Sequence, residues 1–193
     1  MSRPVENQAD LIQILTKVLE LTTPLCTDVP YRLVGTAAAL LRGVQLPCGD
    51  VDLLFKQRSG VDAFASALSG FPCITPVIYL EEARQYFTEI DVQGVEIELS
   101  TVEWEMDSDG VECIGPGPWT HFDWLACGEF TIPVVGLELR LVTELVRNRP
   151  DRFEPIIACL RAHTCDIELV RRGLAAGGAP PEFQQKVIKR LAL

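Results

Sequence analysis

The chain has 193 residues, of which 48% are hydrophobic and 23% charged, an ordinary composition for a globular protein. This length favours one compact domain, or one domain with a small appendage, and allows a sizeable core. Lys and Arg number 17 against 27 Asp and Glu, and the formal charge of −10 disfavours general coating of DNA or RNA. Binding of a single nucleotide through cations stays compatible with this charge.

The cysteines and the N-terminal residues indicate the cellular compartment in which we expect the protein. Seven cysteines are scattered along the chain without a C-x-x-C pair, and neither histidine has a zinc-like spacing to them. The N-terminal residues are polar and lack the apolar run of a signal peptide. No apolar run approaches the roughly 18 residues that span a bilayer. We therefore expect free thiols, no membrane segment and a cytoplasmic location.

The hydrophobic pattern predicts helices and strands that alternate in the first two thirds of the chain. An amphipathic helix over residues 7–20 comes first, because apolar residues recur there at helical spacing. The elements predicted after it are a strand over 31–34, a helix over 36–41, a strand over 50–55, a helix over 61–69, a strand over 74–80 and two strands within 86–101. Residues 107–118 are predicted as loop, since they are rich in Gly, Pro and Asp.

From Leu137 onward the pattern becomes entirely helical. The predicted pieces are an apolar stripe over 137–145 and helices near 151–163, 165–174 and 181–192. The sequence therefore predicts an α+β protein, a mixed sheet with flanking helices followed by a helical C-terminal part from about residue 136.

The strand before Gly35 runs into a glycine, a hydroxyl residue and a helix start at Thr36. Such a junction offers unpaired N–H groups and a positive dipole end, which suit a phosphate. A glycine also lets a ligand approach the backbone closely. The Gly-x-Gly at residues 115–117 is interrupted by prolines, which cannot donate N–H groups, so we expect no phosphate cradle there.

Two aspartates, Asp50 and Asp52, follow fifteen residues after Gly35. On a strand their carboxylates point to the same face. At about 4 Å and an effective dielectric near 20 they would repel by roughly 4 kcal/mol. Such a pair must have a raised pKa, stay solvated or bind a cation. Mg²⁺ prefers one or two carboxylates together with substrate phosphates. A solvated strand face is the structural alternative for these two residues taken alone.

The combination of Gly35-Thr36 with Asp50-Val51-Asp52 resembles the nucleotidyltransferase superfamily with the polymerase-beta-like fold. The signature of that superfamily is a strand, Gly-Gly or Gly-Ser, a short helix and an apolar-flanked D-x-D. The segment looks most like the small-molecule members of the aminoglycoside and lincosamide type. The resemblance covers about residues 30–101, and more weakly 132–141. It implies a nucleotidyltransferase domain over 1–135 and a helical C-terminal subdomain over 136–193.

The resemblance implies metal-dependent transfer of a nucleoside monophosphate from a nucleoside triphosphate (NTP) such as ATP to an acceptor hydroxyl, expected on a small molecule. Asp50 and Asp52 would hold two Mg²⁺ ions, and Gly35 and Thr36 would hold triphosphate oxygens. Thr36 stands where the family usually has Gly or Ser, and it keeps the hydroxyl. Arg42 would help to neutralise the triphosphate.

Members of the superfamily carry a third acid on a later strand, and the resemblance assigns this role to Glu98, or alternatively to Glu96. Both fit because residues 95–100 alternate between apolar and acidic, which puts the two glutamates on one face. Glu98 would act as metal ligand and as base for the acceptor hydroxyl. If Gln93-Gly94 forms a two-residue turn, Asp91 faces Glu96 and another acid, Glu89, faces Glu98. Like charges across strands are destabilising, so this face binds cations or is simply solvated.

The sequence leaves three alternative hypotheses open. In the first, the acceptor is a protein or an RNA end, as in related toxin systems, although the charge of −10 disfavours RNA. In the second, the chain keeps the fold but acts without catalysis, as a nucleotide sensor or partner-binding protein. In the third, the motif is a coincidence in an ordinary α/β domain. The acceptor, the preferred base and the oligomeric state are undetermined by the sequence.

Overall fold

The computed structural model describes residues 2–26 and 28–192, and a mixed seven-stranded sheet lies at its centre. The strands are β1 (Tyr31–Val34), β2 (Asp50–Phe55), β3 (Cys73–Leu80), β4 (Gln85–Val92), β5 (Val95–Ser100), β6 (Phe122–Cys127) and β7 (Phe130–Val135). Their order across the sheet is β3-β4-β5-β2-β1-β7-β6. The pairs β2–β5 and β1–β7 are parallel, and the other neighbours are antiparallel.

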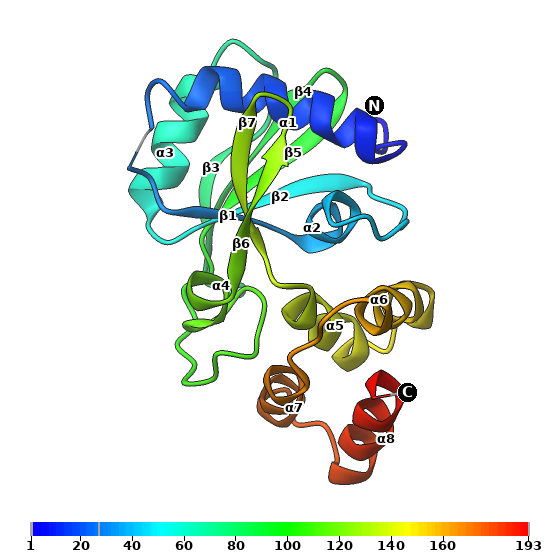
Figure 1. The fold of residues 1–193 in the computed structure, drawn as a ribbon. Coiled ribbons are helices and arrows are strands. Elements are labelled where there is room, and N and C mark those ends of the chain that lie inside the picture. Colours follow the sequence, from blue (N-terminus) through cyan, green and yellow to red (C-terminus); the bar gives the residue numbers. More distant parts are fainter. Residues whose placement is uncertain (1, 27, 193) are drawn as a thin grey trace.

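Helices cover the sheet and then form a separate group at the C-terminus. The first four are α1 (Gln8–Thr22), α2 (Gly35–Leu41), α3 (Arg58–Ala67) and the short α4 (Gly117–Thr120). The last four are α5 (Leu137–Val146), α6 (Pro150–Ala162), α7 (Ile167–Ala176) and α8 (Pro181–Leu191). Helices α1 and α3 lie on one side of the sheet, and α5 to α8 gather on the other (Figure 1). The predicted α+β class is confirmed.

Two hydrophobic clusters hold these parts together. The larger one lies between the sheet and helices α1 and α3, and in it the ring of Phe64 packs 4.8 Å from Phe55 and 5.0 Å from Tyr31, measured between ring centroids. The second joins α5 to α8, and Ala39 of α2 belongs to it. Other residues of α2, such as Ala37 and Leu40, belong to the larger cluster, so helix α2 contacts both clusters. The domain boundary between residues 135 and 136 stays a prediction.

Two strands in the described structure were not predicted. Residues 119–127 mix aromatic and polar residues without clean alternation, and Pro133 interrupts the apolar run of the next strand. In the structure β6 and β7 form an antiparallel hairpin in which Pro133 lies opposite Trp124. Proline is disfavoured within a sheet because it donates no ladder hydrogen bond, so local sequence argued against this strand.

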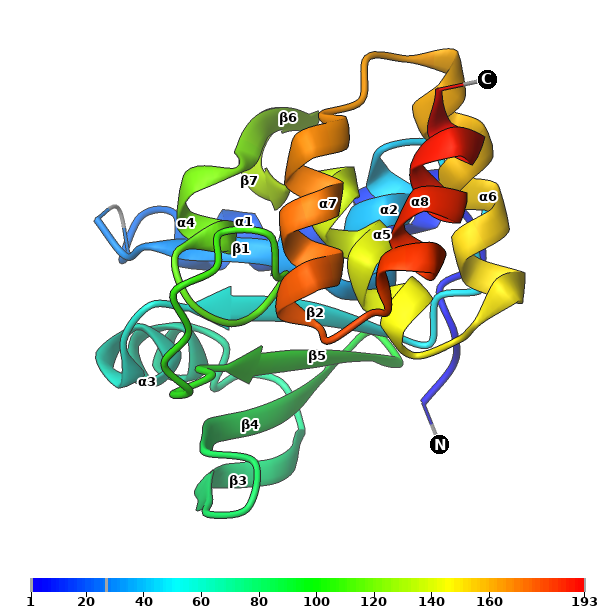
Figure 2. The same cartoon turned by 90° about the horizontal axis from the view of Figure 1, so that it is seen from below.

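The hairpin between β4 and β5 has the predicted turn and register. Gln93 and Gly94 both adopt positive φ values, 58° and 86°, as a two-residue turn of type I′ requires. Asp91 lies opposite Glu96, and Glu89 lies opposite Glu98. In the view from below, β3 and β4 project away from the C-terminal helices (Figure 2).

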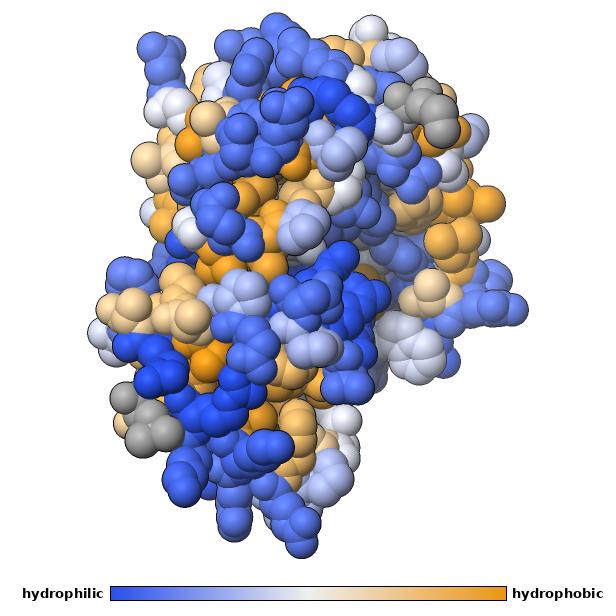
Figure 3. Space-filling view, turned by 90° about the vertical axis from the view of Figure 1, so that its right-hand side faces the viewer, coloured by the Kyte–Doolittle hydropathy of each residue, from blue (hydrophilic) through white to orange (hydrophobic). Residues whose placement is uncertain are grey.

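The surface of the described residues exposes several large apolar side chains, among them Ile74, Val77, Ile78 and Leu80 of the edge strand β3 and Trp124 of β6. None of the helices there combines the length and the apolar character that a membrane crossing needs. All seven cysteines are free in the structure, and Cys73 is the exposed one among them. On the face drawn in Figure 3, hydrophilic residues predominate at the lower end, and apolar residues form small separate patches.

We expect Phe64→Ala to destabilise the fold by about 3–5 kcal/mol, because it removes a fully buried ring and leaves a cavity. Chemical denaturation followed by circular dichroism measures this loss. The matched control is Phe183→Ala in α8, where the ring is 36% exposed and the cost should be clearly smaller. Equal losses in the two variants would contradict the packing described for Phe64.

Candidate active site

The site begins where β1 ends and the backbone turns into α2 at Gly35. Gly35 has a φ of +69°, a conformation that glycine adopts without strain. Val34 pairs with Asp52 on the neighbouring strand, so the Asp52 carboxylate reaches Gly35 directly. A Cβ atom on Gly35 would lie 1.8 Å from Oδ2 of Asp52. Both the backbone conformation and this contact therefore require glycine.

The strand register brings the predicted acids together on one face of the sheet. Asp50 pairs with Glu96, and Asp52 pairs with Glu98, across the parallel strands β2 and β5. Gln85 donates a hydrogen bond of 3.0 Å to Glu98. By contrast, no hydrogen bond to the Asp52 carboxylate is formed within the described part of the chain. Asp52 therefore lies among other acids without a donor.

The surroundings of Asp52 and Glu98 oppose ionisation of these two carboxyl groups. Burial raises the pKa of Asp52 well above its usual value, and repulsion from Asp50, Glu98 and Glu112 adds to the rise. Burial also raises the pKa of Glu98, with repulsion from Asp50 adding and a hydrogen bond to Ser100 opposing. A cation bound here would relieve both effects, because it stabilises the charged forms.

Residues 2–26 and 28–192 contain no group of three or more His, Cys, Asp or Glu side chains that could hold a metal ion alone. Two carboxylates that share coordination with nucleotide phosphates are nevertheless a common arrangement for Mg²⁺. Asp50 and Asp52 fit this arrangement, since they follow one another on the same strand face and the Asp52 carboxylate lacks a donor. The role of Glu98 as third ligand stays a prediction, as does that of Glu96.

A cavity of about 560 Å³ opens beside Asp52 and Glu98, whereas Asp50 and Glu96 do not line it. It is bounded by the sheet, by the irregular segment 101–116 and by helices α5 and α7. The polar and charged side chains that line it are Asp52, Gln85, Glu98, Ser100, Glu112, Arg140, Thr143 and Arg147. Apolar residues such as Trp104 and Met106 line the remainder. The size lies within the range of about 300–1,000 Å³ that is typical of small-molecule sites.

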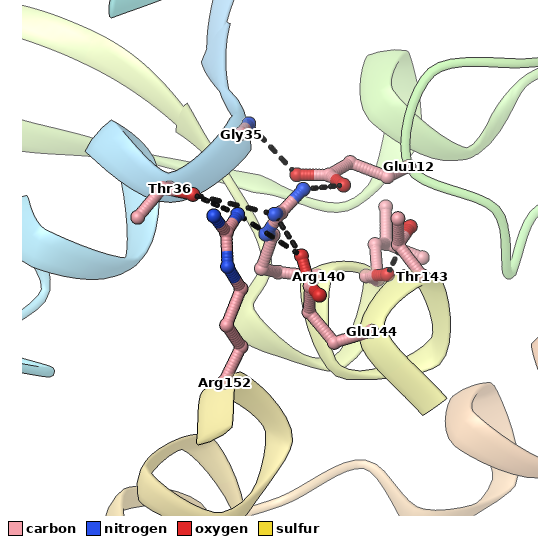
Figure 4. Close-up of polar contacts among 8 residues, drawn as sticks. Gly35, Thr36, Glu112, Arg140, Thr143, Glu144 and Arg152 are labelled. Carbon is pink, nitrogen blue, oxygen red and sulfur yellow. Dashed lines mark hydrogen bonds and ion pairs between the residues drawn. The ribbon is translucent and has the colours of Figure 1, made fainter. Parts of the chain in front are cut away.

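The remaining predicted nucleotide-binding residues, Thr36 and Arg42, differ in their surroundings. The Thr36 hydroxyl accepts hydrogen bonds from Arg152 at 3.1 Å and from Arg140 at 3.4 Å (Figure 4). Arg42 instead donates to the carbonyl groups of Val134 and Val135, both at 2.9 Å, and to Asp123. Arg42 is therefore held by the β6–β7 hairpin, and neither Arg42 nor Thr36 lines the cavity.

Three residues of the site were not predicted, namely Glu112, Arg140 and Glu144. Glu112 accepts hydrogen bonds from the Gly35 N–H at 2.9 Å and from Arg140 at 2.8 Å, and Arg140 also pairs with Glu144 (Figure 4). All three side chains are buried. The i, i+4 spacing of Arg140 and Glu144 in an apolar helix was an available signal. Glu112 gave none, because it lies in an irregular segment far from its partners in the sequence.

Comparison with known proteins shows which fold this is. No protein-family model and no curated protein sequence matches the chain. A solved structure of a candidate nucleotidyltransferase from Thermotoga maritima is similar over 81% of this chain and 96% of its own, with 18% identity and a TM-score of 0.58. An antigenic nucleotidyltransferase-like protein from Paracoccidioides brasiliensis is similar over 98% of this chain and 95% of its own, with 12% identity and a TM-score of 0.54.

A third similar structure, the antibiotic-resistance factor ANT(2'')-Ia, has a TM-score of 0.46 at 12% identity, over 95% of this chain and 90% of its own. That score is too low to support an argument. The first two structures show that the chain has a nucleotidyltransferase-like fold. The resemblance drawn from Gly35-Thr36 and Asp50-Val51-Asp52 is thereby confirmed at the level of the fold.

We expect Gly35→Ala to destabilise the fold by more than the cost of placing a non-glycine residue in the left-handed backbone conformation. The matched control is Gly43→Ala, since Gly43 has a φ of +89° and its Cβ atom, once added, would meet nothing within 4 Å. The control should cost about 1–2 kcal/mol, the penalty for left-handed backbone. Gly35→Ala should cost more, because its methyl group collides with the Asp52 carboxylate. Equal costs by chemical denaturation would contradict this contact.

We expect Asp52→Asn to stabilise the unliganded protein, and to do so more at pH 8 than at pH 5. The raised pKa means that the folded state holds the Asp52 proton more tightly than the unfolded state does. The stabilising contribution of this carboxyl group is thus complete below the unfolded pKa of about 3.9 and declines as the pH rises toward the folded pKa. The asparagine variant does not undergo this decline.

Thermal unfolding of both proteins across this pH range measures the difference. Asp151→Asn, at an exposed position, controls for the loss of one negative charge. A difference between wild type and Asp52→Asn that stays constant from pH 5 to pH 8, or shrinks, would contradict the electrostatic account.

Proposed function

We propose that this protein is a metal-dependent nucleotidyltransferase that moves a nucleoside monophosphate from an NTP to a hydroxyl group of a small molecule. The observation that carries the proposal is the Asp52 carboxylate. It packs against Gly35, lines a cavity, lacks a hydrogen-bond donor among the described residues and is repelled by Asp50 and Glu98. A group placed at such a cost to stability is typical of a site that binds a cation.

In this proposal Asp50 and Asp52 hold Mg²⁺, with two ions expected, and Gly35 and Thr36 orient the triphosphate. Bound Mg²⁺ would stabilise charge on the entering and leaving oxygens of the transfer. Glu98 lines the same cavity, and its raised pKa suits a group that accepts the proton of the acceptor hydroxyl. Arg140 and Arg147, which also line the cavity, supply positive charge for the phosphates.

A small molecule is the acceptor that the cavity supports best. Its volume of about 560 Å³ suits such a ligand, and Trp104 and Met106 add apolar surface beside the acids. The formal charge of −10 works against a nucleic-acid acceptor. One wall of the cavity comes from α5 and α7, so we place the acceptor between the sheet and the proposed helical subdomain over 136–193.

One observation favours a second function, a partner-binding protein without catalysis. The Gly35 N–H, which would bind a phosphate oxygen, already donates to Glu112. If that hydrogen bond persists when an NTP and Mg²⁺ are added, the triphosphate has no access to the Gly35 N–H. Direct measurement of nucleotide binding separates the two functions.

We expect an NTP with Mg²⁺ to raise the unfolding temperature of the wild-type protein. At about 100 times its Kd a ligand stabilises by about 2.7 kcal/mol. For a chain of this size that corresponds to roughly 5–11 °C, at about 2–4 °C per kcal/mol. Thermal unfolding is measured with each of the four NTPs, with and without Mg²⁺. In a separate assay that contains an acceptor, the release of pyrophosphate measures nucleotidyl transfer.

The double variant Asp50→Asn/Asp52→Asn should lose the Mg²⁺-dependent shift. Glu89→Gln should keep it, because this residue is on the same acidic face but on β4, outside the D-x-D pair. A shift that survives in the double variant would contradict the proposed metal site. The absence of any shift with all four nucleotides would favour the non-catalytic function.

A further inference from the structure

The Glu112 carboxylate uses the hydrogen-bond donors that a bound triphosphate would need, namely the Gly35 N–H and Arg140. Its side chain is 1% exposed, and both of its carboxylate oxygens are engaged. Oε1 accepts from the Gly35 N–H at 2.9 Å, and Oε2 accepts from Nη1 of Arg140 at 2.8 Å (Figure 4). A backbone N–H together with a guanidinium group is also a typical donor set for a phosphate oxygen. One anion at a time can use these donors.

The charges around Glu112 make its position costly. It adds a negative charge beside Asp52 and contributes to the raised pKa of that residue. Arg140 compensates for Glu112, but Arg140 also pairs with the buried Glu144. In this network Nε of Arg140 and Oε2 of Glu144 are buried without a hydrogen-bond partner among the described residues. The two carboxylates thus share one guanidinium, and the network is incompletely satisfied.

The segment that carries Glu112 is fastened both to the C-terminal helix α7 and to the sheet. Asp109 pairs at 2.8 Å with His121, which directly precedes β6, and Arg32 of β1 donates to the Pro118 carbonyl at 2.9 Å. Asp109 accepts two hydrogen bonds of 2.9 Å from Arg172 of α7. Next to it, Gly110 approaches α7 so closely that a Cβ on it would lie 2.4 Å from the backbone nitrogen of Gly173. Helix α7 therefore helps to set the position of Glu112, although the group that Glu112 binds belongs to the start of α2.

We propose that Glu112 is an internal competitor of the triphosphate. In the unliganded protein its carboxylate takes the Gly35 N–H and Arg140. A bound triphosphate replaces it there, and Arg140 passes from the Glu112 carboxylate to a phosphate oxygen. The inference rests on the proposed function and adds to it both a further phosphate-binding residue, Arg140, and a means of regulation. The apparent NTP affinity is reduced to the fraction of molecules in which Glu112 has left Gly35.

The first experiment measures binding of Mg²⁺ with each of the four NTPs, and with pyrophosphate as a phosphate probe, by isothermal titration calorimetry. Glu112→Gln removes the negative charge with little change of shape. We expect the variant to bind the NTP roughly tenfold more tightly than wild type or better, because a negative charge that would lie beside the phosphate has been removed. Glu89→Gln is the matched control, because it removes one negative charge from the acidic strand face, while Glu89 accepts from Thr75 and contacts neither Gly35 nor Arg140. It should show no such gain.

The pattern of affinities separates this inference from the proposed function. If wild type and Glu112→Gln bind with equal affinity, or if the variant binds more weakly, the competitor role is wrong while the proposed function stands. If neither protein binds any NTP or pyrophosphate, the proposed function fails and the inference fails with it. Tight binding by Glu112→Gln alone supports both.

Hydrogen exchange on the wild-type protein provides a second readout that does not depend on the folding of any variant. Addition of Mg²⁺ with the tightest-binding NTP should increase amide exchange in residues 107–118, because the Glu112 contacts are broken. Binding with unchanged protection in this segment would overturn the proposal. The charge-removing variant Arg172→Gln should also raise affinity, since it loosens the segment at α7 without touching Gly35, Glu112 or Arg140.

Discussion

The packing of the Asp52 carboxylate against the backbone of Gly35 is the constraint on which the rest of this site depends. It follows from the register of β1 and β2, in which Val34 lies opposite Asp52, and from the positive φ of Gly35. No side chain fits between the two residues. The contact places the end of β1, the start of α2 and the D-x-D pair within one small volume, so a ligand that reaches the Gly35 N–H also reaches the carboxylates.

The clustering of acids around Asp52 lowers the stability of the unliganded fold, and this cost indicates that the acids serve a function. Asp52 and Glu98 have raised pKa values because burial and neighbouring acids oppose their charge. Arg140 also lines the cavity, but Glu112 and Glu144 already share its guanidinium group. A protein selected only for stability would replace such acids, whereas one that binds a cation and a triphosphate needs them. The proposed function and the proposed role of Glu112 both follow from this imbalance of charge.

Much of the fold could be predicted from local sequence, and the site only in part. The strand, glycine and hydroxyl at residues 31–36 and the alternation at residues 95–100 are local patterns, and both gave the correct elements. The turn at Gln93-Gly94 also fixed the register of the acids. Strand β7 was missed because Pro133 argues against a strand unless its neighbours are known. Glu112 was missed for a related reason, since its partners lie 77 and 28 residues away and no periodicity links them.

The most direct measurement is a crystal structure of the wild-type protein with Mn²⁺ and a non-hydrolysable NTP, in which anomalous scattering locates the metal. Mn²⁺ takes the same oxygen ligands as Mg²⁺. The account predicts an anomalous peak at Asp50 and Asp52, a phosphate oxygen on the Gly35 N–H and the Glu112 carboxylate displaced from it. A nucleotide bound elsewhere, or Mn²⁺ away from both aspartates with Glu112 still on Gly35, would contradict it.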